Sequence, residues 1–186
     1  MELQADTAPE MLTGFITFNG RVTALVANQP AVKDGMLTAG ASRKAAKLVR
    51  FTADYGIPLL TLVDCGGFEF APQSEFAPYT SELALLASAY ADNRNAKVTV
   101  TLGRSYGASF TLLGSKALGA DIAFALDSAK ISVMPPETAV EFVFDAQIKA
   151  SDDPDVARAK LLSGWNSVLS SPVAAARNGE IDDIIT

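Results

Sequence analysis

Residues 97–110 read KVTVTLGRSYGASF, a run rich in branched apolar residues that ends in a glycine-rich turn. Residues 57–68 read IPLLTLVDCGGF and repeat this arrangement earlier in the chain. Branched apolar residues favour strands, which are expected over 57–63 and 97–102. The second turn is predicted to open a helix over residues 107–118 that stops at Gly119. A helix start presents unpaired N–H groups and the positive end of the helix dipole. We therefore expect the chemistry at these two turns, where such donors can form an oxyanion hole.

The rest of the chain alternates between strand and helix patterns. An Asn19-Gly20 turn joins two short β-rich runs, 15–18 and 22–26, which predicts a hairpin. Further strands are predicted over 122–126 and 131–134, and helices over 42–54, over about 81–93, and after Pro135, Asp153 and Pro172. Because the central strands lack polar alternation, the pattern indicates an α/β fold with a largely parallel sheet covered by helices.

Particular residues carry expectations about local structure. Ser42 is the predicted N-cap of the helix over 42–54. Trp165 is expected to anchor the terminal helix by packing it onto the body of the protein. Residues 1–13 are expected to form a loose N-terminal lead-in, and 14–186 a single domain.

Composition excludes several classes of function. A net charge of −6 and a pI near 4.6 argue against binding to a nucleic-acid backbone. Neither a signal peptide nor a membrane-spanning apolar run is expected, and a single cysteine fits a reducing cytoplasm. The chain has no histidine, which excludes Ser-His-Asp and Cys-His nucleophiles and makes a metal site improbable. A Ser-Lys pair of Ser109 with Lys97, Lys116 or Lys130 stays open, although no spacing supports it.

Several segments, in order along the chain, resemble one family. They are Gly20-Arg21, residues 26–30 (VANQP), 41–46 (ASRKAA), 57–64 (IPLLTLVD), Tyr106-Gly107, 115–121 (SKALGAD), 129–134 (AKISVM) and 174–185 (AAARNGEIDDII). From about Gly14 onward, this ordered set resembles the C-terminal half of the carboxyltransferase subunit of biotin-dependent acyl-CoA carboxylases. The resemblance implies the crotonase-type spiral of β-β-α units, also found in the Clp protease.

The resemblance also implies roles for individual residues. The family places its biotin-side oxyanion amides in a Tyr-Gly-Gly-Ala-Tyr segment, which matches residues 106–110 here. Ala108 and Ser109 are then the donor pair, with Gly107 beside them. The residues implied to bind biotin or substrate are Gly66, Gly67, Phe68, Asn28, Gln29, Tyr106 and Thr111. Gly66 stands where the family has proline, which is expected to loosen that turn.

In the family, the N-terminal half holds the acyl-CoA and the C-terminal half holds carboxybiotin. A carboxyltransferase subunit is therefore implied, with biotin on a carrier protein, a CoA-binding half on a separate chain, an oligomeric assembly and no metal in this chain. Alternatives are the γ-type subunit of a malonate decarboxylase, an acyl-CoA decarboxylase, a Ser-Lys peptidase, or a non-catalytic scaffold of the same fold.

Overall fold

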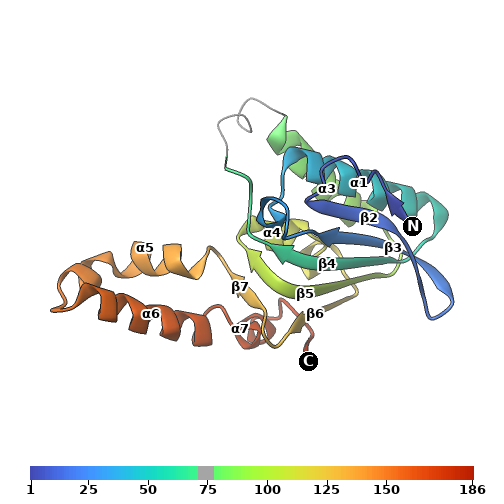
Figure 1. Cartoon of the computed structure of the whole chain (residues 1–186). Helices are drawn as coiled ribbons and strands as arrows, with labels where there is room; N and C mark the ends of the chain where they lie inside the picture. Colours follow the sequence, from blue (N-terminus) through green and yellow to red (C-terminus); the bar gives the residue numbers. More distant parts are fainter. Residues whose placement is uncertain (71–77) are drawn as a thin grey trace.

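The computed structural model describes residues 1–70 and 78–186, and their strands form a single mixed sheet (Figure 1). The strands are β1 (Glu2–Leu3), β2 (Met11–Phe18), β3 (Arg21–Asn28), β4 (Leu59–Cys65), β5 (Lys97–Tyr106), β6 (Ile122–Leu126), β7 (Lys130–Ser132) and β8 (Asp183–Ile185). Their order is β1-β2-β3-β4-β5-β6-β8, and β7 pairs with the end of β5. From β3 onward all pairs are parallel, which confirms the predicted sheet.

The predicted hairpin is confirmed as β2 and β3. These strands pair antiparallel from Met11 opposite Asn28 to Phe18 opposite Arg21. Asn19 and Gly20 at the turn have φ values of 48° and 77°, the left-handed conformation that a two-residue hairpin turn requires. The sequence signal and the backbone therefore agree at this turn.

The expectation of a loose lead-in before residue 14 is wrong. Glu2 pairs with Gly14 and Leu3 with Thr13, so β1 extends the sheet on the outer side of β2. Met11 is fully buried, and Glu10 accepts a hydrogen bond from the buried Thr38 hydroxyl at 2.6 Å. The segment contains no long apolar run, a pattern that favours a loose terminus. Pairing with β2 and burial of Met11 order it instead.

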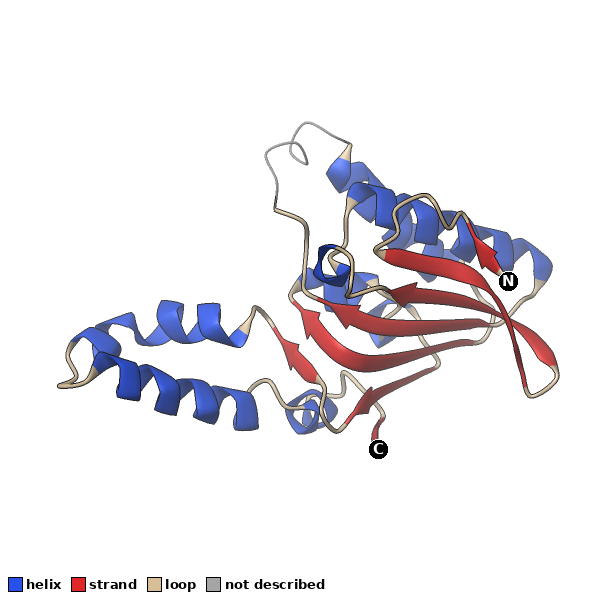
Figure 2. Cartoon of the chain, in the orientation of Figure 1, coloured by secondary structure: helices blue, strands red, loops and turns tan. Residues whose placement is uncertain are grey.

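Helices cover the sheet and also form a projection away from it (Figure 2). They are α1 (Ala39–Tyr55), α3 (Tyr79–Asp92), α4 (Ala108–Leu112), α5 (Pro136–Lys149), α6 (Pro154–Val168), α7 (Pro172–Arg177) and the 3₁₀ turns η1 (Lys33–Gly35) and η2 (Lys116–Leu118). The helices expected after Pro135, Asp153 and Pro172 are confirmed. Helix α1 begins three residues earlier than predicted, because the Thr38 hydroxyl accepts from the Ala41 N–H at 2.9 Å while Ser42 lies inside the helix.

The main core lies between the sheet and the pair α1 and α3. Tyr90 of α3 is fully buried, and its hydroxyl lies 3.0 Å from that of Thr61 on β4. Lys97 begins β5, and its ammonium donates at 2.8 Å to the Tyr90 carbonyl and also to that of Asn93. This ammonium therefore fixes the start of β5 to the end of α3, where the helix dipole favours a positive charge.

The structure corrects two predictions at the end of β5. The strand does not stop at Leu102 but continues to Tyr106, because residues 104–106 pair with β7. The helix expected over 107–118 is broken into α4 and η2 by Gly114, whose φ is 69°. A Cβ at Gly114 would lie 2.7 Å from the Tyr90 ring, so the core next to α3 demands the break.

Helices α5 and α6 form an antiparallel arm that projects away from the sheet (Figure 1). Trp165 of α6 packs edge-on against Phe144 of α5, with ring centroids 6.3 Å apart. The predicted anchoring of the last helix to the body is therefore wrong, because Trp165 joins the two helices of the arm instead. Across residues 1–70 and 78–186, no helix is both long enough and apolar enough to span a bilayer.

Candidate active site

The Gly107 turn lies where β5 ends and α4 begins. Gly107 has a φ of 62°, and its N–H donates to the Ser132 carbonyl of β7 at 2.9 Å. A Cβ there would lie 3.2 Å from the Val133 carbonyl, so glycine fits both the conformation and the space. Ala108 and Ser109 are the first two helical residues, and their N–H groups meet no acceptor among the described residues.

A pocket of about 450 Å³ adjoins this turn. Its lining residues are Gly107, Ala108, Phe110, Thr111, Ile131, Ser132, Val133, Leu169, Ala174, Ala175, Asn178 and Glu180. The lining is mainly apolar, and it contains one carboxylate, that of Glu180, but no lysine or arginine. Of the predicted site residues, the pocket brings together Gly107, Ala108 and Thr111.

The second predicted turn, Gly66-Gly67-Phe68, lies beside residues 34–37. The Gly66 N–H donates to the Asp34 carbonyl at 3.2 Å, and the Gly67 carbonyl accepts from the Leu37 N–H at 2.9 Å. Phe68 forms a parallel bridge with Leu37. These backbone bonds join the turn to the η1 loop in the absence of proline. A Cβ at Gly66 would lie 2.4 Å from the Asp34 carboxylate, so a side chain there would displace that carboxylate.

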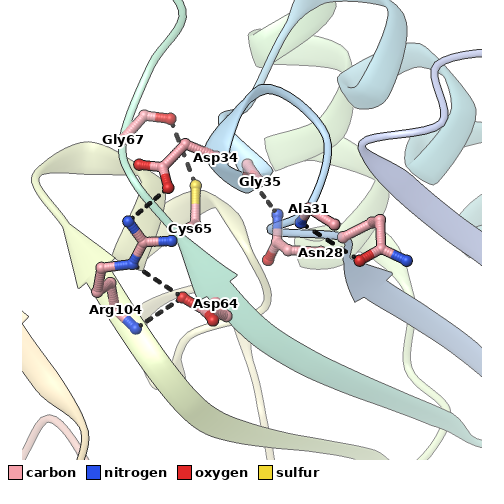
Figure 3. A network of polar contacts seen from close by, with 9 residues as sticks. Asn28, Ala31, Asp34, Gly35, Asp64, Cys65, Gly67 and Arg104 are labelled. Carbon is pink, nitrogen blue, oxygen red and sulfur yellow. Dashed lines mark hydrogen bonds and ion pairs between the residues drawn. The ribbon is translucent and has the colours of Figure 1, made fainter.

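A network of charges joins this turn to β5 (Figure 3). The Arg104 guanidinium donates to Asp34 at 2.6 Å and to Asp64 at 3.2 Å, and the Arg104 N–H donates to Asp64 at 3.0 Å. Gly103 leaves room for the Asp64 carboxylate, which would lie about 2.6 Å from a Cβ at that position. The network thereby joins β4 and β5 to the η1 turn that carries Asp34.

The network contains residues that were not predicted from the sequence to lie at the site, namely Asp34 and Arg104. Lys33 and Asp34 have φ values of 47° and 58°, a conformation that residues other than glycine seldom adopt. Asp34 next to Gly35 is a turn signal that could have marked this loop. The partner of Asp34, Arg104, is seventy positions away in the chain, so no local pattern indicates the pair.

The two turns meet at Cys65. Its thiol donates to the Gly67 carbonyl at 3.3 Å, and the Ser109 hydroxyl of the other turn lies close to it. Burial raises the pKa of the Cys65 thiol, and the nearby Ser109 hydroxyl and Gly67 backbone offset part of that rise. Cys65 is thus a protonated, buried link between the turns.

The remaining predicted residues lie outside the pocket. Asn28 is buried and donates to the Gly35 carbonyl at 3.0 Å, so it braces the loop that carries Asp34. The Gln29 side chain accepts from the Ala31 N–H at 3.4 Å in the same loop. Tyr106 is mostly buried at the end of β5, and desolvation raises its pKa, with a further rise from the Glu137 carboxylate.

Ser109 is poorly placed to act as a nucleophile. It is fully buried, and its hydroxyl donates to the Tyr106 carbonyl at 2.6 Å. Of the lysines considered as its base, Lys97 is bound to the carbonyls at the end of α3, and Lys116 is paired with Asp182. This geometry disfavours the Ser-Lys peptidase alternative.

A family profile described as "Carboxyl transferase domain" matches residues 1–186. The methylmalonyl-CoA carboxyltransferase 12S subunit of Propionibacterium freudenreichii subsp. shermanii is 39% identical over 185 residues, covering 100% of this chain and 35% of that protein. The biotin-dependent acetyl-/propionyl-coenzyme A carboxylase beta5 subunit of Mycobacterium tuberculosis is 34% identical, covering 100% and 34%.

Solved structures agree with the sequence comparisons. The crystal structure of transcarboxylase 12S, described as a hexamer with methylmalonyl-coenzyme A bound, superimposes with a TM-score of 0.95 at 39% identity. The match covers 100% of this chain and 36% of that one. The fold is thus of the crotonase-like α/β class that the sequence led us to expect. Within that class, the chain belongs to the carboxyl transferase family. It spans about a third of the length of the curated relatives it matches.

Proposed function

We propose that this chain forms the carboxybiotin side of a biotin-dependent carboxyltransferase, with Ala108 and Ser109 as oxyanion donors. The observation that carries the proposal is the pair of unpartnered N–H groups at the start of α4, next to the pocket that Ala108 lines. Such donors stabilise a transition state most strongly where negative charge develops on an oxygen atom in a site with little water. The relatives' names point to the same chemistry, since they include carboxyltransferases and a biotin-dependent carboxylase.

The residues present fit the ureido ring of biotin. The ring is small and flat, its oxygen requires N–H donors, and its faces suit the apolar lining provided by Phe110, Ile131 and Val133. When bound, this group supplies the carboxyl that is transferred. Ala108 and Ser109 would orient the ureido oxygen and stabilise its negative charge, and the Cys65 contact would hold the two turns in register.

The charge of the pocket supports a second, CoA-binding side to the enzyme. Coenzyme A carries several phosphates, which proteins commonly bind with lysine and arginine side chains. The pocket lining offers no lysine or arginine and includes Glu180. The proposal therefore includes a separate CoA-binding half, a biotin carrier protein, an oligomeric assembly and a cytoplasmic location. Gly66, Gly67, Phe68, Asn28, Gln29, Tyr106 and Thr111 are proposed to shape the site.

The direction of carboxyl transfer, into or out of the acyl-CoA, depends on parts of the enzyme beyond this site.

The proposal is tested by measuring carboxyl transfer in extracts of the cell that produces the protein. Extract from cells lacking this chain, given a carrier with ¹⁴C-carboxylated biotin and propionyl-CoA, is expected to give no labelled acyl-CoA. Adding back the purified chain should restore labelling, and labelled methylmalonyl-CoA should show the reverse transfer to the carrier. Labelling at the normal rate without the chain would refute the proposal and favour a scaffold role.

A further inference from the structure

Among the described residues that line the pocket beside α4, Glu180 alone carries a charge. Its carboxylate forms no hydrogen bond or ion pair with residues 1–70 or 78–186. Glu180 is an exposed residue, which places it at the mouth of the pocket. A carboxylate only accepts hydrogen bonds, whereas hydroxyl and amide side chains can both donate and accept. The pocket therefore combines a fixed acceptor with the N–H donors at Ala108 and Ser109.

The turn after α7 departs from a local pattern at Glu180. The Glu180 N–H donates to the Ala175 carbonyl at 2.9 Å. The Gly179 N–H donates to the Ala176 carbonyl at 3.0 Å, and Gly179 has a φ of 75°. These features define a Schellman motif, in which the residue at the position of Glu180 frequently packs an apolar side chain against the last turn of the helix. An acidic side chain lacks that contact, and departures of this kind occur at functional sites.

The backbone on both sides of Glu180 is held in place. Ala175 before it and Ile181 after it are buried in the same small apolar cluster. The Asp182 carboxylate accepts from the Ala123 N–H of β6 at 2.8 Å. Glu180 therefore extends from a fixed segment of the chain, as precise recognition of a ligand requires.

The ligand of the proposed function has groups that complement this arrangement. The ureido ring of biotin has one oxygen and two N–H groups, and carboxylation replaces one of these hydrogens with a negatively charged carboxyl. The remaining N–H is attracted to a carboxylate, and the carboxyl is repelled by it. We infer that Glu180 accepts the N–H of the uncarboxylated nitrogen and so turns the carboxylated edge of the ring away from itself. This inference rests on the proposed function, in which Ala108 and Ser109 bind the ureido oxygen.

The experiment removes the acceptor from the protein and, separately, the N–H groups from the ligand. Glu180→Gln removes the charge and keeps the size of the side chain. Asp54→Asn makes the same change at an exposed position of α1, a helix that contributes no residue to the pocket. The ¹⁵N-labelled chains are titrated with biotin methyl ester and with its N1′,N3′-dimethyl derivative, which keeps the oxygen but has no N–H. Binding is followed by the amide shifts of Ala108 and Ser109.

Glu180→Gln should bind biotin methyl ester about tenfold more weakly than wild type does, the effect of losing one hydrogen bond to a charged group. Its affinity for the dimethyl derivative should equal that of wild type, and Asp54→Asn should bind both ligands as wild type does. Glu180→Leu supplies the apolar residue that the motif favours, so it should unfold at or above the wild-type temperature although it binds biotin methyl ester weakly. This combination would separate recognition of the ligand from a structural role.

The outcomes distinguish the role of Glu180 from the proposed function. Equal affinity of wild type and Glu180→Gln for biotin methyl ester, or an equal loss of affinity for both ligands, would overturn the role of Glu180 alone. The same loss with Asp54→Asn would also overturn it, because the effect would then come from net charge. Absence of binding of biotin methyl ester to wild type would overturn the proposed function and the role of Glu180 with it.

Discussion

Replacing Ala108 with proline is expected to lower carboxyl transfer by the complete enzyme by about 10²- to 10³-fold, the typical loss for one oxyanion donor. Proline removes the N–H that we propose as a donor. Ala108 is the first residue of α4, the helix position that tolerates proline best, and Gly107 before it imposes little steric restriction. The KM for acyl-CoA should change little, because that substrate is proposed to bind the other half.

Ala108→Gly is the matched control. It removes the methyl group but keeps the N–H, so transfer should stay within a few fold of wild type. Circular dichroism and thermal unfolding should show that both variants fold. Wild-type turnover in a folded Ala108→Pro variant would remove Ala108 from the oxyanion hole.

Replacing Gly35 with alanine is expected to cause the largest loss of stability among the glycine substitutions near the site. A Cβ at Gly35 would lie 2.4 Å from the Asp64 carbonyl and 3.4 Å from the Asn28 Cβ. The φ of 63° adds left-handed strain of about 1 kcal/mol. Displacing the backbone at Asp64 adds about 2 kcal/mol, as overpacking does, which gives a total near 3 kcal/mol in the free energy of unfolding.

Gly56→Ala separates these two contributions. Gly56 has nearly the same φ, 66°, but nothing lies within 4 Å of a Cβ there. This variant should lose only about 1 kcal/mol. Urea unfolding of both variants measures the difference. Equal losses would show that the packing between Gly35 and Asp64 does not hold the loop beside the active site.

Much of the fold follows from the sequence because its signals are local. The Asn19-Gly20 turn, the apolar runs of β4 and β5, and the proline starts of α5, α6 and α7 each depend on a few neighbouring residues. Parallel pairing then brings the ends of β4 and β5 together, which is why the two glycine turns could be predicted to lie close to each other.

The remaining features depend on contacts between distant residues. Thr38 rather than Ser42 caps α1, and Thr38 is also tied to Glu10 far upstream. Gly114 breaks the helix after β5 because the Tyr90 ring occupies the space. The arm could not be told from a helix packed on the body, since Trp165 at helical spacing fits either arrangement. Glu180 lies in one of the segments that carry the family resemblance, but no local pattern places it in the pocket beside α4.

The central claim is that the amides at the start of α4 bind the biotin ureido group. The most direct measurement is a titration of the ¹⁵N-labelled chain with biotin methyl ester, followed by the amide shifts of Ala108 and Ser109. The account predicts that these two signals move together and saturably, that Gly56 does not move, and that coenzyme A at the same concentrations leaves Ala108 and Ser109 unchanged. Shifts of Ala108 and Ser109 with coenzyme A but not with biotin methyl ester would contradict the account.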